Sequence, residues 1–468
     1  MFEFLIENHD YQHVHFIGIG GISMSGLTEI LLIEGYKVSG TDNVDSSIVN
    51  RLRNLGANVF IGHNKDNILG ADLIVYTDAI SSDNEELSAA INSSAFVVDR
   101  ATFLGALMKN YKNSIAISGT HGKTTTTSMV ATIMNHGKLN PTILIGGELD
   151  DIGGNVKLGT DEYILTEACE YKANILKYFP TMAVILNMDE DHLDYFKSMD
   201  HIVDTFIGYV KNLDDKGHLI INIDDPHADK LINETKAKII SFGLEKTCDY
   251  RAENIRYDSE GFPSYSLNIR NSESHEITLS VMGIHNIYNS LAAIATAHTH
   301  GLPMDVISEF ITYYNGVHRR LELKGYINNT TKVVDDYAHH PTEIKATLSA
   351  LKKSAKGKIY CVFQPHTFTR TKMLLDSFAR SFEGASKVII ADIYAARELD
   401  NGEIHSKELA ERIRENGEDS IYMDSFEEIE KYLVENATAN DIIVTMGAGN
   451  VYKIGESILS NHNENKAV

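Results

Sequence analysis

The sequence predicts an α/β protein of three domains, and three observations support this prediction. The chain has 468 residues, whereas a typical domain has roughly 100–200. Short apolar runs alternate with helical patterns in the first hundred residues and again beyond residue 320, as in parallel sheets covered by helices on both faces. Between Asp249 and Met282 the pattern changes to short alternating segments with polar turns. We expect domains at residues 1–112, 113–320 and 321–468, with boundaries uncertain by several residues.

The first domain is expected to begin with a buried strand and to continue as alternating strands and helices. The apolar run HVHFIG predicts the strand, and the following glycine-terminated pattern predicts a helix. The expected elements are a strand at His13–Gly18, a helix at Ser25–Gly35, a strand at Lys37–Asp42, a helix at Ser47–Leu55 and a strand at Ala71–Tyr76.

A second alternating region begins with the apolar run SIAIS, a glycine turn and a long helical stretch. Its expected elements are a strand at Ser114–Ser118, a helix to about His136, strands at Tyr163–Thr166, Ala183–Asn187 and His218–Ile223, and helices at Asn286–His300 and Met304–Tyr314. The segments YRAENIRYD, SYSLNI and EITLSV predict antiparallel hairpins inserted in this domain or appended to it.

The third region again predicts a three-layer α/β arrangement. Its expected elements are a strand at VVDDYA, a helix at Pro341–Lys352, a strand at KIYCVFQPH, a helix at Leu374–Glu383, a strand at VIIADIYA, a helix from Ser406 and a strand at DIIVTMGAG.

Composition excludes several classes of protein. The formal net charge is −23, which opposes nucleic-acid binding because affinity for a phosphate backbone comes from clustered cations. No apolar run approaches the roughly 18–20 residues of a membrane span, and the N-terminal residues lack a secretory pattern. The three cysteines, Cys169, Cys248 and Cys361, are too far apart for a disulfide framework or a zinc site. We expect no nucleic-acid partner, no membrane contact and a cytoplasmic location.

The strongest functional signal is the segment GTHGKT, Gly119–Thr124, between an expected strand and an expected helix. Glycines let backbone amides face a phosphate, a lysine reaches the terminal phosphates, and a hydroxyl can bind Mg²⁺. Ile117 occupies the position of the first glycine in the full G-x-x-x-x-G-K-[ST] motif. The alternative is a glycine-rich turn with an exposed lysine, but the strand–turn–helix context favours a nucleotide-binding loop.

A second glycine-rich segment, GIGGISMSG, follows the first strand. It is similar to the dinucleotide-binding pattern G-x-G-x-x-G, but Ser23 replaces the third glycine. Asp42 ends the next strand, at the distance where that pattern carries an acidic residue. The segment favours a diphosphate at a helix N-terminus and does not identify the nucleoside. Tight packing of helix on strand is the structural alternative.

Two acidic clusters follow expected strands of the second region. Glu167 and Glu170 belong to LTEACEY, and Asn187, Asp189, Asp191, His192 and Asp194 belong to NMDEDHLD. Because ligands collect at the carboxyl ends of parallel strands, both clusters are expected to face the same crevice as the phosphate loop. Carboxylates beside a phosphate loop suit Mg²⁺. Taken singly, each acidic residue is better explained as a solvated loop carboxylate or a helix cap, and only the presence of two clusters at strand ends makes a ligand site equally plausible.

Three further segments carry potential ligands. Asn286 and Asn289 lie in GIHNIYN, where helix capping is the alternative. HRR at residues 318–320 supplies paired guanidinium groups suited to phosphate or carboxylate, although a solvated domain junction explains it equally well. DDYAHHP at residues 335–341 and QPHTFTRT at residues 364–371 each follow a strand. This position adds weight to a site at these histidines, but on spacing alone plain surface positions remain the more frequent explanation.

Taken together, seven ordered segments resemble the Mur ligases of peptidoglycan synthesis, and in particular the members that add L-alanine. The segments are GTHGKTTTT, TEACEY, NMDEDHLDYF, GIHNIYNSLAA, HRRLE, DDYAHHPTEI and FQPHTFTRT. The resemblance extends from HFIGIGG to GAGNVYKIG and therefore covers nearly the whole chain.

The resemblance implies a Rossmann-like N-terminal domain that binds a UDP-sugar, a central P-loop ATPase domain with added antiparallel strands, and a Rossmann-like C-terminal domain that binds an amino acid. It implies a reaction in which ATP and Mg²⁺, with Mn²⁺ as an alternative metal, drive the joining of L-alanine to the lactyl carboxylate of UDP-N-acetylmuramate through an acyl phosphate. Either a monomer or a homodimer is compatible with it.

The resemblance also implies site residues. UDP-sugar binding would use Gly18, Gly20, Gly21, Ser23 and Asp42. ATP binding would use Gly119, Thr120, His121, Gly122, Lys123, Thr124, Thr125, Asn286, Asn289, Arg319 and Asp336. The metal would be bound by Thr124, Glu167 and His192, and the amino acid by Tyr337, His339 and Arg370. The catalytic residues would be Lys123, Glu167, His192 and His339, the last as a candidate proton acceptor.

Two features qualify the resemblance. Thr367 stands where relatives often have an additional arginine, which leaves Arg370 as the expected clamp for the amino-acid carboxylate. No lysine occupies the carbamylated position of several sibling ligases, and LTEACEY is similar to the alanine-adding members, which use carboxylates there.

Three alternative functions would each explain part of the sequence. A murein tripeptide ligase would act on the same nucleotide sugar, but QPHTFTRT and a compact pocket favour the alanine reaction. A nicotinamide-dependent oxidoreductase would explain GIGG and Asp42 but leaves GTHGKT, the acidic clusters and HRR without a role. A non-catalytic nucleotide-binding module would explain the phosphate loop but not the C-terminal segments.

Overall fold

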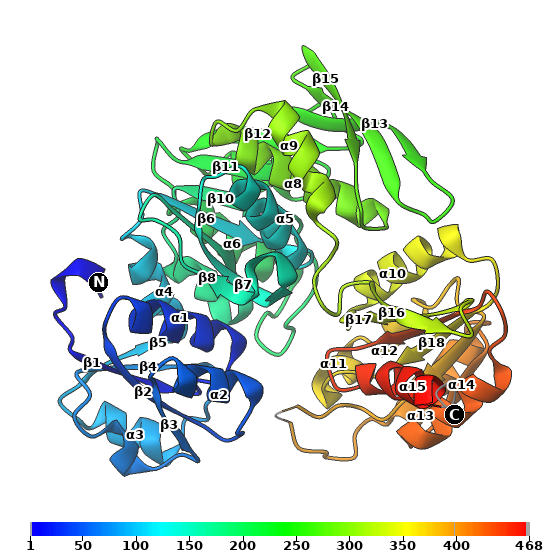
Figure 1. Cartoon of the computed structure of the whole chain (residues 1–468), viewed down its shortest axis with the longest axis horizontal. Coiled ribbons are helices and arrows are strands. Elements are labelled where there is room, and N and C mark those ends of the chain that lie inside the picture. Colours follow the sequence, from blue (N-terminus) through cyan, green and yellow to red (C-terminus); the bar gives the residue numbers. More distant parts are fainter. Residues whose placement is uncertain (1, 397, 465–468) are drawn as a thin grey trace. The chain divides into compact units, whose positions relative to one another are not determined.

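The computed structural model describes residues 2–396 and 398–464. It consists of three β-sheets with flanking helices (Figure 1), which confirms the predicted α/β fold class. The chain divides into two compact units. Unit 1 comprises Met1–Met188, Asp200–Phe242 and Ala292–Ile307, and unit 2 comprises Asp189–Met199, Gly243–Leu291 and Ser308–Val468. The three domain boundaries drawn from the sequence stay a prediction.

The first sheet of unit 1 has five parallel strands in the order β3-β2-β1-β4-β5. Its strands are β1 (His13–Ile17), β2 (Lys37–Asp42), β3 (Asn58–Ile61), β4 (Leu73–Tyr76) and β5 (Phe96–Asp99). Its helices are α1 (Ile22–Ile33), α2 (Ser47–Asn54), α3 (Glu85–Ile91) and α4 (Arg100–Met108), with short 3-10 helices η1 (Ile6–Asn8) and η2 (Lys65–Ile68). All five residues of β1 are buried, as expected for a central strand covered on both faces.

The two faces of this sheet are packed by different apolar residues. Ile17 and Ile74 form a cluster with Leu87 and Ala90 of α3. The neighbouring residue Phe16 points to the opposite face, because side chains alternate along a strand, and its ring contacts Phe103 of α4 edge-on at 6.1 Å. This alternation explains why every side chain of β1 is buried, His13 and His15 included.

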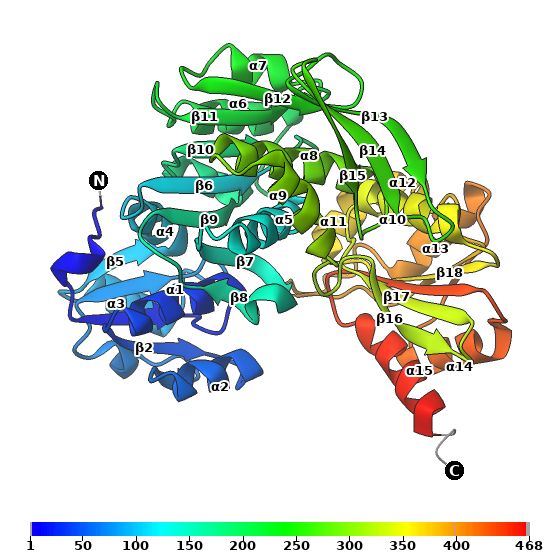
Figure 2. The same cartoon turned by 45° about the horizontal axis from the view of Figure 1, so that its top comes forward.

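The second sheet of unit 1 contains consecutive strands β12-β11-β10-β6-β9-β7-β8 (Figure 2). They are β6 (Asn113–Ser118), β7 (Thr142–Leu149), β8 (Gly154–Lys157), β9 (Tyr163–Ala168), β10 (Met182–Ile185), β11 (His218–Asn222) and β12 (Lys238–Gly243). The associated helices are α5 (Lys123–His136), η3 (Asp150–Ile152), η4 (Tyr171–Lys177), α6 (Met199–Val210) and α7 (Ala228–Ile232). β7 and β8 form an antiparallel pair at one edge, whereas β6 lies parallel to both β9 and β10.

Unit 2 contains the predicted antiparallel strands and a third sheet. β13 (Tyr250–Tyr257), β14 (Pro263–Ile269) and β15 (Glu273–Thr278) pair in antiparallel fashion. Helices α8 (Ile284–Thr299) and α9 (Met304–Phe310) and the 3-10 helix η5 (Ile311–Tyr313) follow, and residues 292–307 of this stretch belong to unit 1. The predicted helix at Met304–Tyr314 is therefore shorter than expected and ends in a 3-10 turn.

The third sheet has the order β16-β17-β21-β18-β19-β20 and is parallel except for β16. Its strands are β16 (Glu322–Ile327), β17 (Thr331–Asp336), β18 (Ile359–Phe363), β19 (Lys387–Ile390), β20 (Ser420–Tyr422) and β21 (Ile442–Met446). Its helices are α10 (Pro341–Ser354), α11 (Phe368–Met373), α12 (Leu375–Ala379), α13 (Ser406–Glu415), α14 (Phe426–Asn436) and α15 (Tyr452–Glu464). Separate apolar clusters cover its two faces, one around Phe363 and the other around Val362.

Candidate functional site

The segment Gly119–Gly122 forms a tight loop between β6 and α5, as the sequence predicted. Gly122 has φ +85° and Gly119 has φ +134°, and a Cβ on Gly119 would lie 3.0 Å from the backbone nitrogen of Asn187. Residues other than glycine rarely adopt such backbone angles. The loop therefore needs glycine at both positions, and Lys123 begins α5, where helix amides favour an anion.

Asn187, which follows the neighbouring strand β10, stabilises this loop through hydrogen bonds. Its carbonyl oxygen accepts a hydrogen bond from Thr120 N at 3.1 Å, and its side-chain Oδ1 accepts one from His121 N at 2.8 Å. Its Nδ2 donates to His121 O at 3.0 Å. The sequence suggested Asn187 only as a potential ligand. Its observed role is to fix the backbone of the loop, which motif spacing alone does not indicate.

The Lys123 ammonium group has several oxygen partners inside unit 1. Its Nζ donates to Gly119 O at 2.5 Å, to Thr120 O at 3.0 Å and to Glu170 Oε2 at 3.0 Å. Burial opposes the charge of Lys123, but the carboxylate of Glu170 outweighs this effect and raises the pKa of the lysine. Lys123 is therefore a fixed positive charge at the loop.

Glu167, the other carboxylate of LTEACEY, lies beside the threonine of the loop. Thr124 Oγ1 donates to Glu167 Oε2 at 3.2 Å, and the backbone amide of Gly146 on β7 donates to Glu167 Oε1 at 2.6 Å. Thr124 and Glu167 thus present two oxygen donors at the N-terminus of α5. Such donors suit Mg²⁺, which prefers hard oxygen ligands.

The glycine-rich segment of the first sheet is organised by β2. The amides of Gly18 and Ile19 both donate to Thr41 O, at 2.8 and 2.9 Å. The amide of Gly20 donates to Asp42 Oδ2 at 2.9 Å, and a Cβ at Gly20 would lie 2.8 Å from the same oxygen. The structure therefore brings the predicted residues Gly18, Gly20 and Asp42 together. Gly21 is the N-cap of α1, and Ser23 belongs to its first turn.

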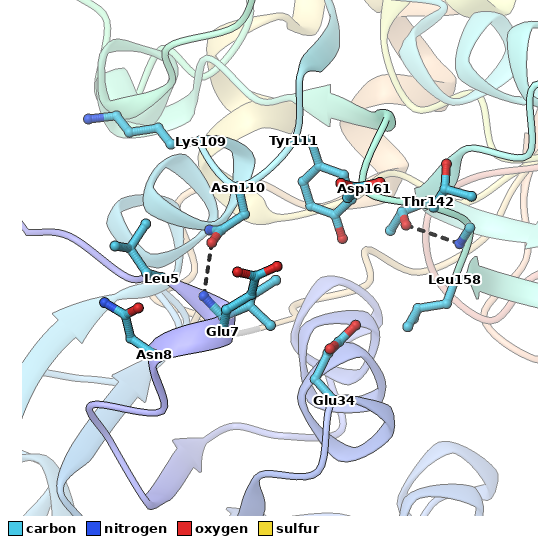
Figure 3. A pocket seen from close by; sticks show the side chains of 13 residues that line it. Leu5, Glu7, Asn8, Glu34, Lys109, Asn110, Tyr111, Thr142, Leu158 and Asp161 are labelled. Atoms are coloured by element: carbon cyan, nitrogen blue, oxygen red, sulfur yellow. Dashed lines mark hydrogen bonds between the residues drawn. The ribbon is translucent and has the colours of Figure 1, made fainter.

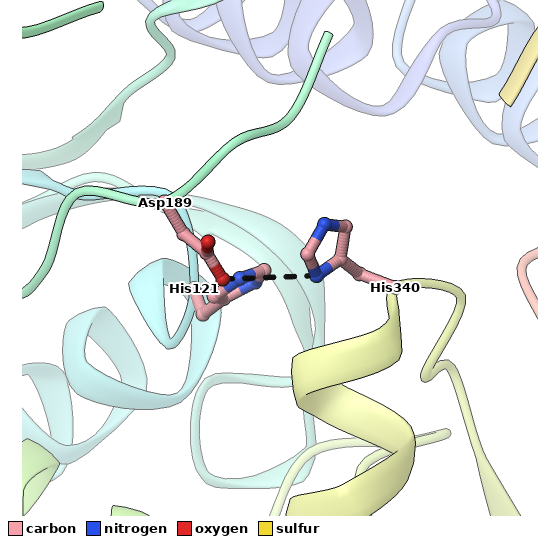
Figure 4. A group of neighbouring side chains, drawn as sticks. All are labelled: His121, Asp189 and His340. Atoms are coloured by element: carbon pink, nitrogen blue, oxygen red, sulfur yellow. Dashed lines mark ion pairs between the residues drawn. The ribbon is translucent and has the colours of Figure 1, made fainter. Parts of the chain in front are cut away.

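The segment at residues 189–199 belongs to unit 2, and its acidic residues pair there. Arg370 Nη2 donates to Asp191 Oδ1 at 2.8 Å. Burial would raise the pKa of Asp191, but the neighbouring His192 and Arg370 lower it well below its usual range. Asp189 lies 3.8 Å from His340 Nδ1 (Figure 4) and accepts a hydrogen bond from Thr342 Oγ1 at 2.6 Å.

Tyr337, His339 and Arg370, the predicted amino-acid-binding residues, lie in the same region of unit 2. The rings of Tyr337 and His339 meet edge-on at 5.3 Å, and His339 meets His366 at 5.9 Å. Arg370 Nη1 lies 3.3 Å from His366 Nδ1. Burial lowers the pKa of His339 to about 4, although Glu343 acts in the opposite direction. His339 is therefore a neutral imidazole at neutral pH.

Thr367 has an unusual backbone conformation, with φ 64° and ψ 145°. A β-branched residue rarely adopts a positive φ. Its hydroxyl accepts from Arg370 N at 3.4 Å, and its amide donates to Tyr394 O at 2.9 Å. These contacts hold the turn that presents Arg370.

Four further predicted residues lie in unit 2. Asn289 Nδ2 donates to Asn286 Oδ1 at 2.9 Å, so the two asparagines contact each other at the start of α8. Arg319 Nε donates to Asp335 Oδ2 at 3.1 Å. Asp336 accepts from the amides of Leu321 and Ala338, at 2.7 Å each, and burial raises its pKa to about 6.

A cavity of about 370 Å³ lies elsewhere in unit 1 (Figure 3). It is lined by the N-terminal segment, the residues after α4 and the turn before β9, and Asn110 Oδ1 accepts from Ile6 N there at 2.9 Å. These lining residues lie outside the predicted site, so the cavity gives no support to the predicted binding residues.

Family models match three consecutive segments of the chain. They are described as the Mur ligase family catalytic domain at residues 13–112, the Mur ligase middle domain at residues 117–297, and the Mur ligase glutamate ligase domain at residues 319–449. The chain belongs to the Mur ligase family, as its sequence motifs predicted.

Relatives within this family are similar over nearly the full chain. A UDP-N-acetylmuramate–L-alanine ligase of Acetivibrio thermocellus is 50% identical over 456 residues, which are 97% of each chain. The crystal structure of a UDP-N-acetylmuramate–alanine ligase from Thermotoga maritima superposes with a TM-score of 0.82 at 27% identity, covering 97% of this chain and 99% of that one. A murein peptide ligase from Psychrobacter arcticus gives 0.73 at 25% identity, covering 96% and 98%.

Across the described residues, each helix is too short or too polar to cross a bilayer.

Proposed function

We propose that this protein is an ATP-dependent ligase that joins L-alanine to the lactyl carboxylate of UDP-N-acetylmuramate and releases ADP and phosphate. The single observation that carries the proposal is the 50% identity over 97% of the chain to an enzyme named for this reaction. The position of Lys123, Thr124 and Glu167 at one phosphate loop supports the proposal.

The first step is phosphoryl transfer to a carboxylate. A carboxylate oxygen attacks the γ-phosphorus of ATP, the bond to the bridging oxygen breaks, and ADP leaves with an acyl phosphate as the other product. Attack by one anion on another requires cations to offset their repulsion. Lys123 supplies one fixed positive charge, and the amides at the start of α5 supply further donors. We assign Arg319 to the phosphates by its motif position.

A divalent metal fits this chain's own residues at the loop. Thr124 Oγ1 and Glu167 Oε2 are oxygen donors 3.2 Å apart, and Mg²⁺ commonly combines one or two protein oxygens with substrate phosphates. Bound there, Mg²⁺ would neutralise phosphate charge. We propose Thr124, Glu167 and His192 as its ligands, with Mn²⁺ as the alternative metal.

The second step is attack by the amine of alanine on the acyl carbon. The carbon–oxygen bond to phosphate breaks, and the nitrogen loses a proton. We propose His339 as the group that accepts or relays this proton because its ring lies beside Tyr337 among the expected amino-acid-binding residues. Its lowered pKa, about 4, leaves the imidazole unprotonated at neutral pH but makes it a weak base, so it would pass the proton on rather than keep it. Arg370 and Tyr337 would hold the alanine carboxylate. Arg370 is paired with Asp191, so substrate binding would exchange one carboxylate partner for another.

The remaining assignments follow the motifs. Gly18, Gly20, Gly21, Ser23 and Asp42 would bind the UDP part, because β2 holds this loop at the N-terminus of α1. Gly119–Gly122 and Thr125 would complete the phosphate site, with Asn286 and Asn289 near adenine and Asp336 near the ribose. Dependence on ATP leads us to expect a cytoplasmic enzyme.

The test is an ADP-release assay with purified protein, ATP, Mg²⁺ and UDP-N-acetylmuramate. Omitting the amino acid, the nucleotide sugar or the metal should each reduce ADP release to background, and L-alanine should restore it. Glycine, L-serine and the murein tripeptide are each tested in place of L-alanine. Faster ADP release with tripeptide than with L-alanine would replace the alanine assignment, and release that ignores the nucleotide sugar would refute the proposal.

A further inference from the structure

The β7–β8 hairpin of unit 1 contacts the N-terminal turn of α1. Figures 1 and 2 show the hairpin beside this helix. Asn155 of β8 is 1% exposed, and its Nδ2 donates to Ile22 O, in the first residue of α1, at 2.8 Å. The same nitrogen lies 3.5 Å from Ser25 Oγ. An edge strand of the second sheet therefore fixes the helix that follows the glycine-rich loop of the first sheet.

The other end of the Asn155 amide is also satisfied. Its Oδ1 accepts from Arg51 Nη2 of α2 at 2.8 Å, and Arg51 forms an ion pair with Glu29 of α1 at 2.6 Å. Burial raises the pKa of Glu29, and Arg51 opposes this effect. A buried amide with both ends paired is costly to remove, because its partners then lose their hydrogen bonds.

Close backbone packing accompanies these hydrogen bonds. A Cβ at Gly26 of α1 would lie 2.6 Å from Leu144 Cδ2 of β7 and 3.7 Å from both Asn155 Nδ2 and Val156 Cβ. The helix therefore approaches the hairpin more closely than a helix with a side chain at this position could. Such contacts transmit displacement, because packed interiors resist compression.

The same hairpin contacts the phosphate loop through its other strand. Gly146, within β7, donates its amide to Glu167 Oε1, and Glu167 accepts from Thr124. The pairing of β7 with β8 is irregular between Leu144 and Leu149, around Gly146. One short hairpin thus contacts the candidate metal ligand on one side and the candidate diphosphate helix on the other.

From this arrangement we propose that Asn155 is a positioning residue that couples the two nucleotide sites: it ties α1 to the β7–β8 hairpin, so that occupation of the phosphate loop strengthens binding of the nucleotide sugar. The inference rests on the proposed function, because it takes UDP-N-acetylmuramate and ATP as the two ligands. Coupling of this kind is reciprocal, so each ligand should strengthen the other by the same factor.

The test is calorimetric titration of the full-length protein. UDP-N-acetylmuramate is titrated with and without a non-hydrolysable ATP analogue and Mg²⁺, and the coupling factor is the ratio of the two dissociation constants. We expect the wild-type factor to be at least about fivefold. Asn155→Asp keeps the acceptor for Arg51 but cannot donate to Ile22 O, and its factor should fall close to one while the affinity for the ATP analogue alone changes less than about twofold.

Two further variants keep the experiment interpretable. Asn155→Ser removes both hydrogen bonds without adding a buried charge, and it replaces Asn155→Asp if thermal melting shows that the aspartate variant is unfolded. Asn135→Ala is the matched control. It removes a hydrogen bond between α5 and Lys157 of the same strand β8 and should keep the wild-type coupling factor.

The outcomes separate the two claims. Equal coupling factors in wild type and in the folded Asn155 variants would overturn the inference, as would a wild-type factor of one. A wild-type protein that releases no ADP with its three substrates would instead overturn the proposed function. Loss of coupling in Asn135→Ala as well would also contradict the specific role of Asn155.

Discussion

At the scale of single residues, the charge of Lys123 is set by its immediate surroundings. Its ammonium group contacts two loop carbonyls and Glu170, and its side chain is only 16% exposed. An ammonium group held this way is already oriented at the N-terminus of α5. The cation is therefore preorganised, and little of the substrate's binding free energy is needed to orient it.

Replacement of Lys123 by methionine should abolish catalysis without unfolding the protein. The side chain keeps its length but loses the positive charge that offsets repulsion between the two anions, so kcat should fall by at least about 100-fold. The measurement is ADP release at saturating substrates. Lys236→Met, at an exposed lysine, is the control and should retain wild-type turnover. Retained activity in Lys123→Met would refute the nucleotide-binding loop.

Glu167→Gln should raise the concentration of Mg²⁺ needed for half-maximal activity. The amide can still accept from Gly146, but it is neutral and binds a divalent cation less tightly than a carboxylate does. We expect a shift of at least about tenfold in a titration of ADP release against Mg²⁺. If the Mg²⁺ requirement is unchanged while kcat falls, Glu167 stabilises the loop and does not bind the metal.

At the scale of secondary structure, two glycines in helices of unit 1 make contrasting contacts. A Cβ at Gly105 of α4 would lie 2.0 Å from the carbonyl oxygen of Lys177, which is backbone. A Cβ at Gly208 of α6 would meet Leu176 Cδ2 at 2.8 Å, which is the end of a flexible side chain that is 38% exposed. The first neighbour cannot move without shifting η4, whereas the second can rotate away.

The two alanine substitutions should therefore have opposite consequences. Gly105→Ala should destabilise the protein by several kcal/mol, about 2–4 kcal/mol, because it forces the backbone of η4 away from α4. Gly208→Ala should be neutral or stabilising by up to about 1 kcal/mol, because alanine is the better helix former. Urea unfolding followed by circular dichroism measures both. Equal effects of the two substitutions would contradict this reading of the packing.

Elements with a clear hydrophobic period could be predicted from the sequence, and elements set by tertiary contacts could not. The sequence predicts β2 at its observed bounds. It also predicts α10 with the correct first residue and an end two residues early, because a proline marks the start of this helix and charged residues mark its end. The β7–β8 hairpin was missed, since Gly146 and Gly147 interrupt its apolar run and β8 has only four residues. β10 ends at Ile185 rather than Asn187, because Asn187 turns to hydrogen-bond with the phosphate loop.

Within the candidate site, residues in local motifs could be predicted from the sequence, and residues positioned by tertiary contacts could not. Lys123, Thr124 and Asp42 belong to motifs whose spacing predicts their chemistry. The structure places Lys123 and Thr124 at the N-terminus of α5 and Asp42 at the end of β2. The sequence does not indicate a buried role for Asn155, because an isolated asparagine after two glycines is typical of a turn. Its role depends on a helix more than a hundred residues away in the sequence.

At the scale of the whole molecule, histidines that are buried without charge make stability depend on pH. His300 of unit 1 contacts the ring of Tyr163 edge-on at 5.3 Å, and its Nε2 lacks a hydrogen-bond partner among the described residues. Burial, together with the smaller effect of the nearby His218, lowers the pKa of His300 to about 4. Protonation of His300 therefore favours the unfolded chain.

Replacing His300 by phenylalanine should make the protein more tolerant of acid. Between pH 6.5 and about 4 the unfolded chain binds a proton at His300 that the folded protein does not bind, so stability falls as the pH is lowered. His300→Phe removes this difference, and its melting temperature should fall less over the same pH range. Differential scanning calorimetry at half-unit steps measures the slope. A slope identical to that of wild type would show that His300 does not contribute.

The structure identifies the partners of the acidic residues in the two clusters, which the order of the motifs along the chain does not. The sequence placed both acidic clusters at the crevice of the phosphate loop. Glu167 and Glu170 contact residues of the loop and of the N-terminus of α5. Asp189 and Asp191 pair with Thr342 and Arg370 in unit 2, and their expected position at the crevice stays a prediction. Position after a strand indicated a functional segment, but it could not show which partners the side chains would choose.

The environment of Lys123 has a practical consequence for chemical labelling. Acylating reagents attack only an unprotonated amine, and the raised pKa of this lysine keeps it protonated at neutral pH. Its three oxygen neighbours also restrict access to the nitrogen. Mass-spectrometric footprinting with such reagents should therefore modify exposed lysines such as Lys236 early and Lys123 late.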